Sequence, residues 1–252
     1  AMVAAYSDTM KFGTSVLQVP IRNPVVLAKE MATLDYLSNG RFLPAIGLGQ
    51  EDPREYEACG VSKEDRGRRT DEAMTVMRRL WQEDNVTHEG DFFTLHDVTV
   101  TPKPAQLPNL AVWIGGRSPA AQRRVGRVGD GWLVSSATPD EIAEGIEIIF
   151  STAGELGRTI ERDHIGALVT FYIADTQEEA SRVAEAYVTR PRPDAHFSEY
   201  TALGQPEQIR DTIQHYLDAG ASKFVMRPSC DPKDAMAQLE LFGKEVLPYF
   251  HP

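Results

Sequence analysis

The sequence predicts an α/β fold of the TIM (β/α)8 barrel type, in a single domain that spans residues 1–252. Short apolar runs alternate along the chain with longer segments in which apolar residues recur at helical spacing. Six strand-like runs occur, near residues 12, 42, 111, 132, 168 and 224. Strict alternation indicates parallel strands joined by helical crossovers, and about 250 residues is the usual size of such a barrel.

The elements follow from apolar spacing and from the residues at their boundaries. Strands are expected at 11–17, 42–47, 111–114, 132–134, 165–174 and 223–226. Helices are expected at 24–37, 68–81, 119–128, 139–156, 177–187, 207–219 and 233–247. The first helix has Asn23 as its N-cap and Pro24 at its first position, and Asn39-Gly40 ends it. Pro44 weakens hydrogen bonding within the second strand.

Three segments do not fit the alternation. Residues 50–67 form a polar stretch before the second helix. Residues 86–88 and 92–95, joined by Glu89-Gly90-Asp91, predict a β-hairpin, with 98–101 as a further extended piece. Residues 188–203 are polar and contain two prolines, so we expect a loop or a mobile lid.

Composition excludes several classes of function. The net charge of −11 argues against a general nucleic-acid surface. No apolar run approaches the length that spans a bilayer, and residues 1–11 do not resemble a signal peptide. The two cysteines and six histidines show no metal-ligand spacing, so no metal site is expected. The cysteine pattern suits a reducing cytoplasm.

One turn has the chemistry of a phosphate site. A buried strand ends at Gly115-Gly116, Arg117 follows, and Ser118 is the N-cap of a helix that begins with a proline. Paired glycines allow close approach to the backbone, and a helix N-terminus offers unpaired amide donors with partial positive charge. A tight strand-to-helix turn with no ligand is the alternative interpretation.

Two further groups of polar residues lie near this helix in the sequence. Ser135 and Ser136 end the next strand, where hydroxyls of a barrel point to the active face, although small polar residues also simply terminate strands. Arg123, Arg124 and Arg127 share one helix. We expect a solvated helix face there, and the alternative is contact with an acidic coenzyme tail.

Several motifs in order give the sequence a family resemblance. They are Gly13–Leu17, Arg22-Asn23-Pro24, Leu37–Phe42, Gly47-Leu48-Gly49, His88–Phe93, Trp113–Ser118, Gly129–Trp132 and Gly204–Glu207. With them the chain resembles the bacterial luciferase-like superfamily, most closely the branch that uses the deazaflavin coenzyme F420, such as F420-dependent glucose-6-phosphate dehydrogenases.

The resemblance implies roles for residues that composition does not single out. It implies a non-prolyl cis peptide at Ser15-Val16 that supports the coenzyme ring. It places Gln50 where the sugar-phosphate dehydrogenase branch has an acidic residue, with Glu51 next to it as either a catalytic acid or a solvated loop charge. The sugar-phosphate branch carries a lysine after the Ser135-Ser136 position, where this chain has Ala137-Thr138.

The resemblance also implies that two strand–helix units, roughly 60 residues, precede residue 11 in the family. A truncated chain, a natural short paralogue and a barrel completed by another chain are the three explanations.

Together these observations predict a cytoplasmic oxidoreductase, commonly a homodimer in this family, that transfers a hydride between F420 and a small organic molecule. An FMN-dependent luciferase-like monooxygenase is the first alternative. A non-catalytic flavin-binding or remnant barrel is the second.

Overall fold

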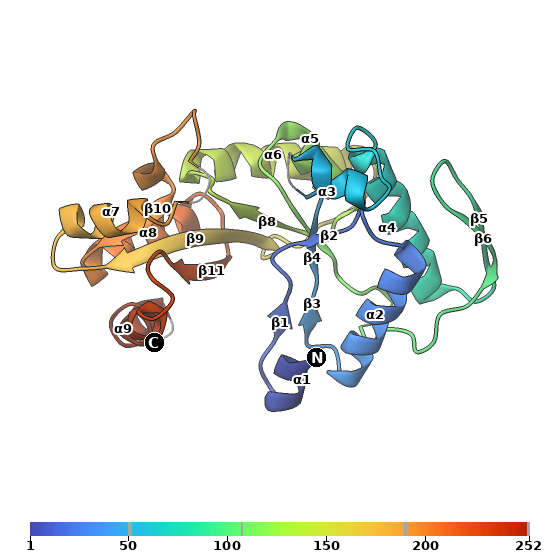
Figure 1. The fold of residues 1–252 in the computed structure, drawn as a ribbon, viewed down its shortest axis with the longest axis horizontal. Coiled ribbons are helices and arrows are strands. Elements are labelled where there is room, and N and C mark those ends of the chain that lie inside the picture. Colours follow the sequence, from blue (N-terminus) through green and yellow to red (C-terminus); the bar gives the residue numbers. More distant parts are fainter. Residues whose placement is uncertain (50–51, 107, 189–190, 251–252) are drawn as a thin grey trace. The chain divides into compact units, whose positions relative to one another are not determined.

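The structure is a computed structural model that describes residues 1–252 except 50–51, 107, 189–190 and 251–252. The chain divides into two compact units. Unit 1 comprises Ala1–Trp132 and Ser151–Ile160, and unit 2 comprises Leu133–Phe150 and Glu161–Pro252. Each unit is described below by itself, with the labels of Figure 1.

Unit 1 contains most of the strand–helix alternation. Its elements are α1 (Met2–Tyr6), β1 (Phe12–Gly13), β2 (Leu17–Gln18), α2 (Pro24–Leu37), β3 (Phe42–Leu43), β4 (Ala45–Gly47), α3 (Pro53–Ala58), α4 (Arg66–Gln82), β5 (Val86–Glu89), β6 (Thr94–Val98), β7 (Trp113–Gly115) and α5 (Pro119–Val128). Two elements, β8 (Gly131–Ser135) and α6 (Pro139–Glu155), have residues in both units.

Outside the β5–β6 hairpin, the paired strands of unit 1 are parallel, as predicted. Strand β4 pairs with β2 on one side and with β7 on the other, and β1 pairs with β3. Parallel order brings the carboxyl ends of β2, β4 and β7 to the same edge, where barrels of this type place their sites. Helices α2 and α4 lie side by side, and their core includes Leu27, Met31, Met77 and Leu80, each at most 3% exposed (Figure 1).

The prediction of one strand over 11–17 and one over 42–47 is wrong, because each is interrupted. Thr14 separates β1 from β2: its Oγ1 donates to Ala45 O at 2.7 Å and accepts from Ala45 N at 3.0 Å. Pro44 separates β3 from β4, since proline has no amide hydrogen for a ladder.

The polar stretch at 50–67 contains a helix that the sequence pattern did not predict. Asp52 caps α3 by accepting from Arg54 N at 3.0 Å, and Pro53 follows it at the first helical position. Tyr56 is the one buried residue of this six-residue helix. A single buried position gives no apolar periodicity, so the capping pair Asp52-Pro53 was the available signal.

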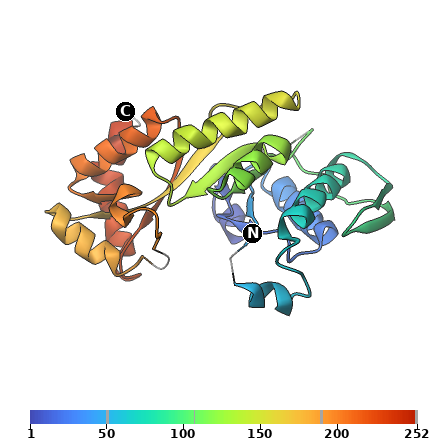
Figure 2. The same ribbon diagram turned by 90° about the horizontal axis from the view of Figure 1, so that it is seen from above.

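The β5–β6 hairpin is confirmed as an antiparallel pair. It lies beside α4 in both ribbon views (Figures 1 and 2). Glu72 of α4, whose side chain is 14% exposed, accepts from Phe92 N at 3.0 Å and Phe93 N at 2.9 Å and contacts His88 Nε2 at 3.1 Å. This carboxylate therefore clamps the hairpin turn onto α4.

Unit 2 is built on one long strand. Its elements are β9 (Ile165–Ile173), α7 (Gln177–Glu185), a 3-10 turn η1 (Phe197–Glu199), β10 (Thr201–Gly204), α8 (Pro206–Asp218), β11 (Lys223–Pro228), α9 (Ala235–Glu245) and α10 (Leu247–Phe250). Thr170 of β9 is in register with Thr201 of β10 and with Arg227 of β11, so β10 and β11 lie on opposite sides of β9.

The prediction that 188–203 is a loop or mobile lid is wrong over its second half. Phe197 and residues 200–203 are buried, and β10 pairs in parallel with β9. The short run Thr-Ala-Leu-Gly after two prolines is too brief to show strand periodicity. Tertiary pairing with β9, rather than local sequence, makes this segment a strand.

Candidate functional site

The turn after β7 has a backbone that only glycine adopts without strain. Gly116 has a φ of 113°, and a Cβ built on it would lie 2.8 Å from the Cβ of Ala121. Ser118 is the N-cap of α5: its side chain accepts from Ala121 N at 3.3 Å, and Pro119 is the first helical residue. The predicted Gly-Gly–cap–Pro arrangement is therefore present.

Buried side chains hold this turn in place. Trp132 Nε1 donates to Gly116 O at 2.9 Å, and Gln122 Nε2 donates to Arg117 O at 3.0 Å. Gln122 is 5% exposed, and its Oε1 has no hydrogen-bond partner among the described residues. Because two successive carbonyls are engaged by the protein, the turn has a fixed geometry before any ligand arrives.

One of the three arginines of α5 does not lie on a solvated face. Arg124 is 7% exposed, and its Nε donates to Asp71 Oδ1 at 2.5 Å. Arg127 pairs with the same carboxylate at 2.9 Å, while Arg123 is exposed. The prediction of a solvated face is therefore wrong for Arg124, which joins α5 to α4. The burial of Arg124 depends on its ion pair with Asp71, which lies 53 residues away, so the local sequence could not predict it.

The Ser15-Val16 peptide bond is cis, as the resemblance implies. Val16 is 41% exposed, and a Cβ on Gly47 of β4 would lie 2.7 Å from Val16 Cγ2. A Cβ on Gly13 would overlap the carbonyl oxygen of Leu43. Both glycines thus allow the 13–16 segment to lie directly against β3 and β4, with the Val16 side chain partly open to solvent.

A carboxylate that the sequence pattern did not single out lies beyond the carboxyl end of β2. Glu55 of α3 is half-buried, and its Oε2 accepts from Gln18 Nε2 at 3.1 Å. Tyr56 OH donates to Leu48 O at 2.6 Å, which fixes α3 against the chain that leaves β4. The predicted site residues Gln50 and Glu51 lie outside the described residues. Glu55 is therefore an acid of this segment that lies beside the end of β2.

Ser135 is the last residue of β8, and Ser136 begins the loop that follows it; both lie in unit 2. Ser135 is exposed, and Ser136 is half-buried with a φ of 53°. The carbonyl oxygen of Ser136 accepts from Arg192 Nη1 at 2.7 Å, and that of Ala137 accepts from Tyr216 OH at 2.6 Å. Burial raises the pKa of Tyr216, so its hydroxyl keeps its proton.

Metal binding and membrane spanning find no support in the part of the chain that the structure describes. Those residues contain no group of three or more His, Cys, Asp or Glu that could hold a metal ion. In the same residues, no helix is long and apolar enough to cross a membrane.

Comparison with known proteins places this geometry in context. The family model described as luciferase-like monooxygenase matches residues 1–227. The F420-dependent glucose-6-phosphate dehydrogenase of Kineococcus radiotolerans is 31% identical over 279 residues, which cover 99% of this chain and 81% of that protein.

Two solved structures share the fold. An F420-dependent secondary alcohol dehydrogenase, in complex with an F420–acetone adduct, matches with a TM-score of 0.82 at 22% identity and covers 98% of this chain and 81% of that one. The FMN complex of the oxygenating constituent of 3,6-diketocamphane monooxygenase from Pseudomonas putida matches at 0.78 and 20%, covering 98% and 81%. These likenesses confirm the predicted fold class.

Proposed function

The chain belongs to the luciferase-like monooxygenase family, and from this premise we propose that it is an oxidoreductase that uses coenzyme F420. In this proposal a hydride passes between the coenzyme and a small organic substrate. The observation that carries it is the turn at Gly115–Ser118, which is built as an anion cradle next to the start of a ten-residue helix.

The cradle fits a phosphate group. Gly116 has no room for a side chain, so the backbone itself is the surface offered to a ligand. The N-terminal amides of α5 carry partial positive charge, and Arg117 adds a full positive charge next to them. We propose that Gly115, Gly116, Arg117 and Ser118 hold the coenzyme phosphate. Ser135 and Ser136 are proposed as further hydroxyl donors.

The segment before β2 fits a flat ring. Val16 offers a partly exposed apolar side chain, and Gly47 behind it has no side chain that could push it away. We propose that Ser15 and Val16 support the coenzyme ring. F420, when bound, supplies the hydride-transfer chemistry, and the protein contributes position and electrostatics.

Glu55 is the acid we propose for proton handling at the substrate. We propose that Gln18 orients the carboxylate of Glu55 through Oε2 and that this carboxylate exchanges a proton with the substrate. The lysine that the sugar-phosphate branch carries is replaced by Ala137-Thr138, so a sugar phosphate is not the substrate we propose.

Binding of FMN instead of F420 is the second candidate, because an FMN complex shares the fold. Titration of the purified protein with F420 and with FMN, followed by fluorescence, separates the two. We expect saturable F420 binding that excess FMN does not displace. FMN binding with no response to F420 would favour the monooxygenase, and no binding of either would leave a non-catalytic protein.

A further inference from the structure

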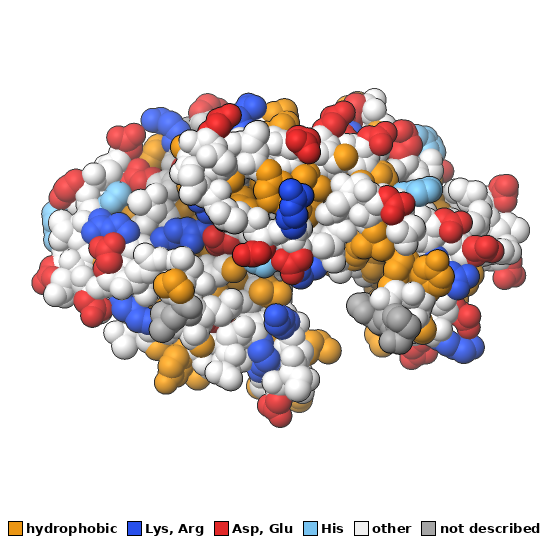
Figure 3. Space-filling view, turned by 180° about the vertical axis from the view of Figure 1, so that it is seen from behind, with side chains coloured by type: hydrophobic (Ala, Val, Ile, Leu, Met, Phe, Trp, Pro, Cys, Tyr) orange, Lys and Arg blue, Asp and Glu red, His pale blue; other side chains and the backbone are white. Residues whose placement is uncertain are grey.

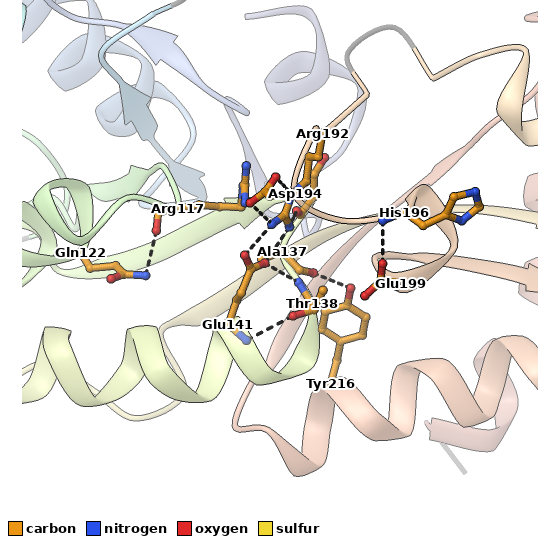
Figure 4. A network of polar contacts seen from close by, with 11 residues as sticks. Arg117, Gln122, Ala137, Thr138, Glu141, Arg192, Asp194, His196, Glu199 and Tyr216 are labelled. Carbon is orange, nitrogen blue, oxygen red and sulfur yellow. Dashed lines mark hydrogen bonds and ion pairs between the residues drawn. The ribbon is translucent and has the colours of Figure 1, made fainter.

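Arg192 makes five hydrogen bonds in unit 2, near the carboxyl end of β8. Its Nε donates to Asp194 at 3.1 Å, its Nη1 to Ser136 O and Glu141, both at 2.7 Å, and its Nη2 to Glu141 at 2.6 Å and Asp194 at 2.8 Å. These five bonds use all five donors of a guanidinium. Figure 4 shows Arg192, Asp194 and Glu141 pointing toward one another.

Apart from Asp194, which lies on the same segment as Arg192, the bonded groups belong to the loop after β8 and to α6. The carbonyl of Ser136 is held by Arg192, that of Ala137 by Tyr216, and Thr138 N donates to Glu141 Oε2 at 2.9 Å. Three successive residues are thus anchored by side chains. Ser136 has its φ at 53°, a backbone angle that a serine adopts when its surroundings enforce it.

Arg192 also controls the charge beside the loop. Its side chain is 6% exposed, and that of Glu141 is 32% exposed, so water screens this pair poorly. Glu141 and Asp194 raise the pKa of Arg192 through their hydrogen bonds, so the guanidinium stays charged. Without Arg192, Glu141 would lose two charge-assisted hydrogen bonds beside a loop that is proposed to bind an anion.

We propose that Arg192 is a positioning residue for the coenzyme phosphate, acting through Ser135 and Ser136. It sets the backbone of the loop and neutralises Glu141. Arg192 and Asp194 then support the binding site from outside the 135–138 loop. This inference rests on the proposed function, because Ser135 and Ser136 are phosphate donors only if the coenzyme binds there.

The test compares the binding of two probes to the full chain. One is F420, and the other is the deazaflavin with its ribityl chain but without the phosphate. Arg192→Lys keeps the charge but loses the fork geometry, so F420 affinity should fall about tenfold, the loss of one to two charge-assisted hydrogen bonds. Affinity for the phosphate-free probe should change less than about twofold. Arg192→Met should lose more F420 affinity, and adding Glu141→Gln to it should restore part of that loss.

Arg158→Lys is the matched control. Arg158 also holds carbonyls, those of Gly126 at 2.6 Å and Gly129 at 2.7 Å, but these lie at the end of α5 and before β8 begins. Arg158→Lys should leave the ratio of the affinity for F420 to the affinity for the phosphate-free probe unchanged.

Equal losses for both probes in Arg192→Lys would show a merely structural role and overturn the inference, as would no loss for either. If the wild-type protein binds F420 and Arg192→Lys binds it equally well, the inference fails and the proposed function stands. If the wild-type protein does not bind F420, both fail.

Discussion

At Gly116 the proposed phosphate site depends on the absence of a side chain. Its φ is positive, and a Cβ at this position would lie only 2.8 Å from the Cβ of Ala121, so no other residue fits without strain. Gly116→Val should therefore weaken F420 binding by tenfold or more, about 1.4 kcal/mol, because the turn must shift to fit the new side chain.

The measurement is an equilibrium titration by fluorescence. Gly154→Ala is the control: a Cβ at Gly154, in the last turn of α6, meets nothing within 4 Å, so coenzyme affinity should not change. Unchanged affinity in Gly116→Val would show that the phosphate binds elsewhere.

A substitution of Glu55 tests its proposed role in proton transfer. Glu55→Gln keeps a hydrogen-bonding side chain beside Gln18 but cannot carry a proton between states. We expect F420 affinity to stay within about twofold, while the turnover of an active substrate falls by about 100-fold, the lower range for general acid–base catalysis. Steady-state kinetics checks this, and full turnover in the variant would remove Glu55 from the mechanism.

Among the elements, the β5–β6 hairpin is held to α4 in part by one carboxylate, that of Glu72. Glu72→Ala removes the acceptor for two backbone amides and the His88 contact, so the free energy of unfolding should fall by about 1–3 kcal/mol. Denaturant unfolding measures it.

Glu89→Ala on the same hairpin is the comparison. Glu89 and its partner His96 are 66% and 72% exposed, so that variant should stay within about 0.5 kcal/mol of the wild type. Equal losses in the two variants would contradict the clamp.

The pairing of strand β10 predicts that its backbone amides are protected from hydrogen exchange. Its four residues are buried and paired with β9, so their amides should exchange with deuterium far more slowly than those of α1, which has no buried residue. Rapid exchange throughout 201–204 would contradict the pairing.

Two helices in which an N-cap residue is followed by proline were predicted correctly from the local sequence. Asn23 with Pro24, and Ser118 with Pro119, marked two helix starts correctly, and the structure shows both side chains capping. Elements defined by distant partners were missed: β10 exists through β9, and the Thr14 interruption exists through Ala45.

The candidate site likewise combines a local motif, which the sequence predicted, with long-range contacts, which it did not. The Gly115-Gly116 turn is a local pattern, and the sequence predicted it. Arg192 reaches Glu141 across 51 residues and Ser136 across 56, and Arg124 reaches Asp71 across 53. No spacing rule within one element links such pairs, because tertiary folding brings them together.

For the whole molecule, charge argues for local recognition of the coenzyme. The net charge is −11, and acidic and basic side chains are scattered over the face in Figure 3 instead of forming one basic patch. A long-range field of this sign does not attract an anion. In the proposed function, coenzyme affinity therefore comes from short-range donors, and the Gly115–Ser118 turn is the candidate.

The most direct test of this account is an experimental structure of the protein with F420 bound. The account predicts phosphate oxygens within about 2.7–3.2 Å of the backbone amides at Gly116 and the start of α5. It also predicts the coenzyme ring in van der Waals contact, about 4 Å, with Ser15 and Val16. A phosphate bound away from α5, or a ring that touches neither residue, would contradict it.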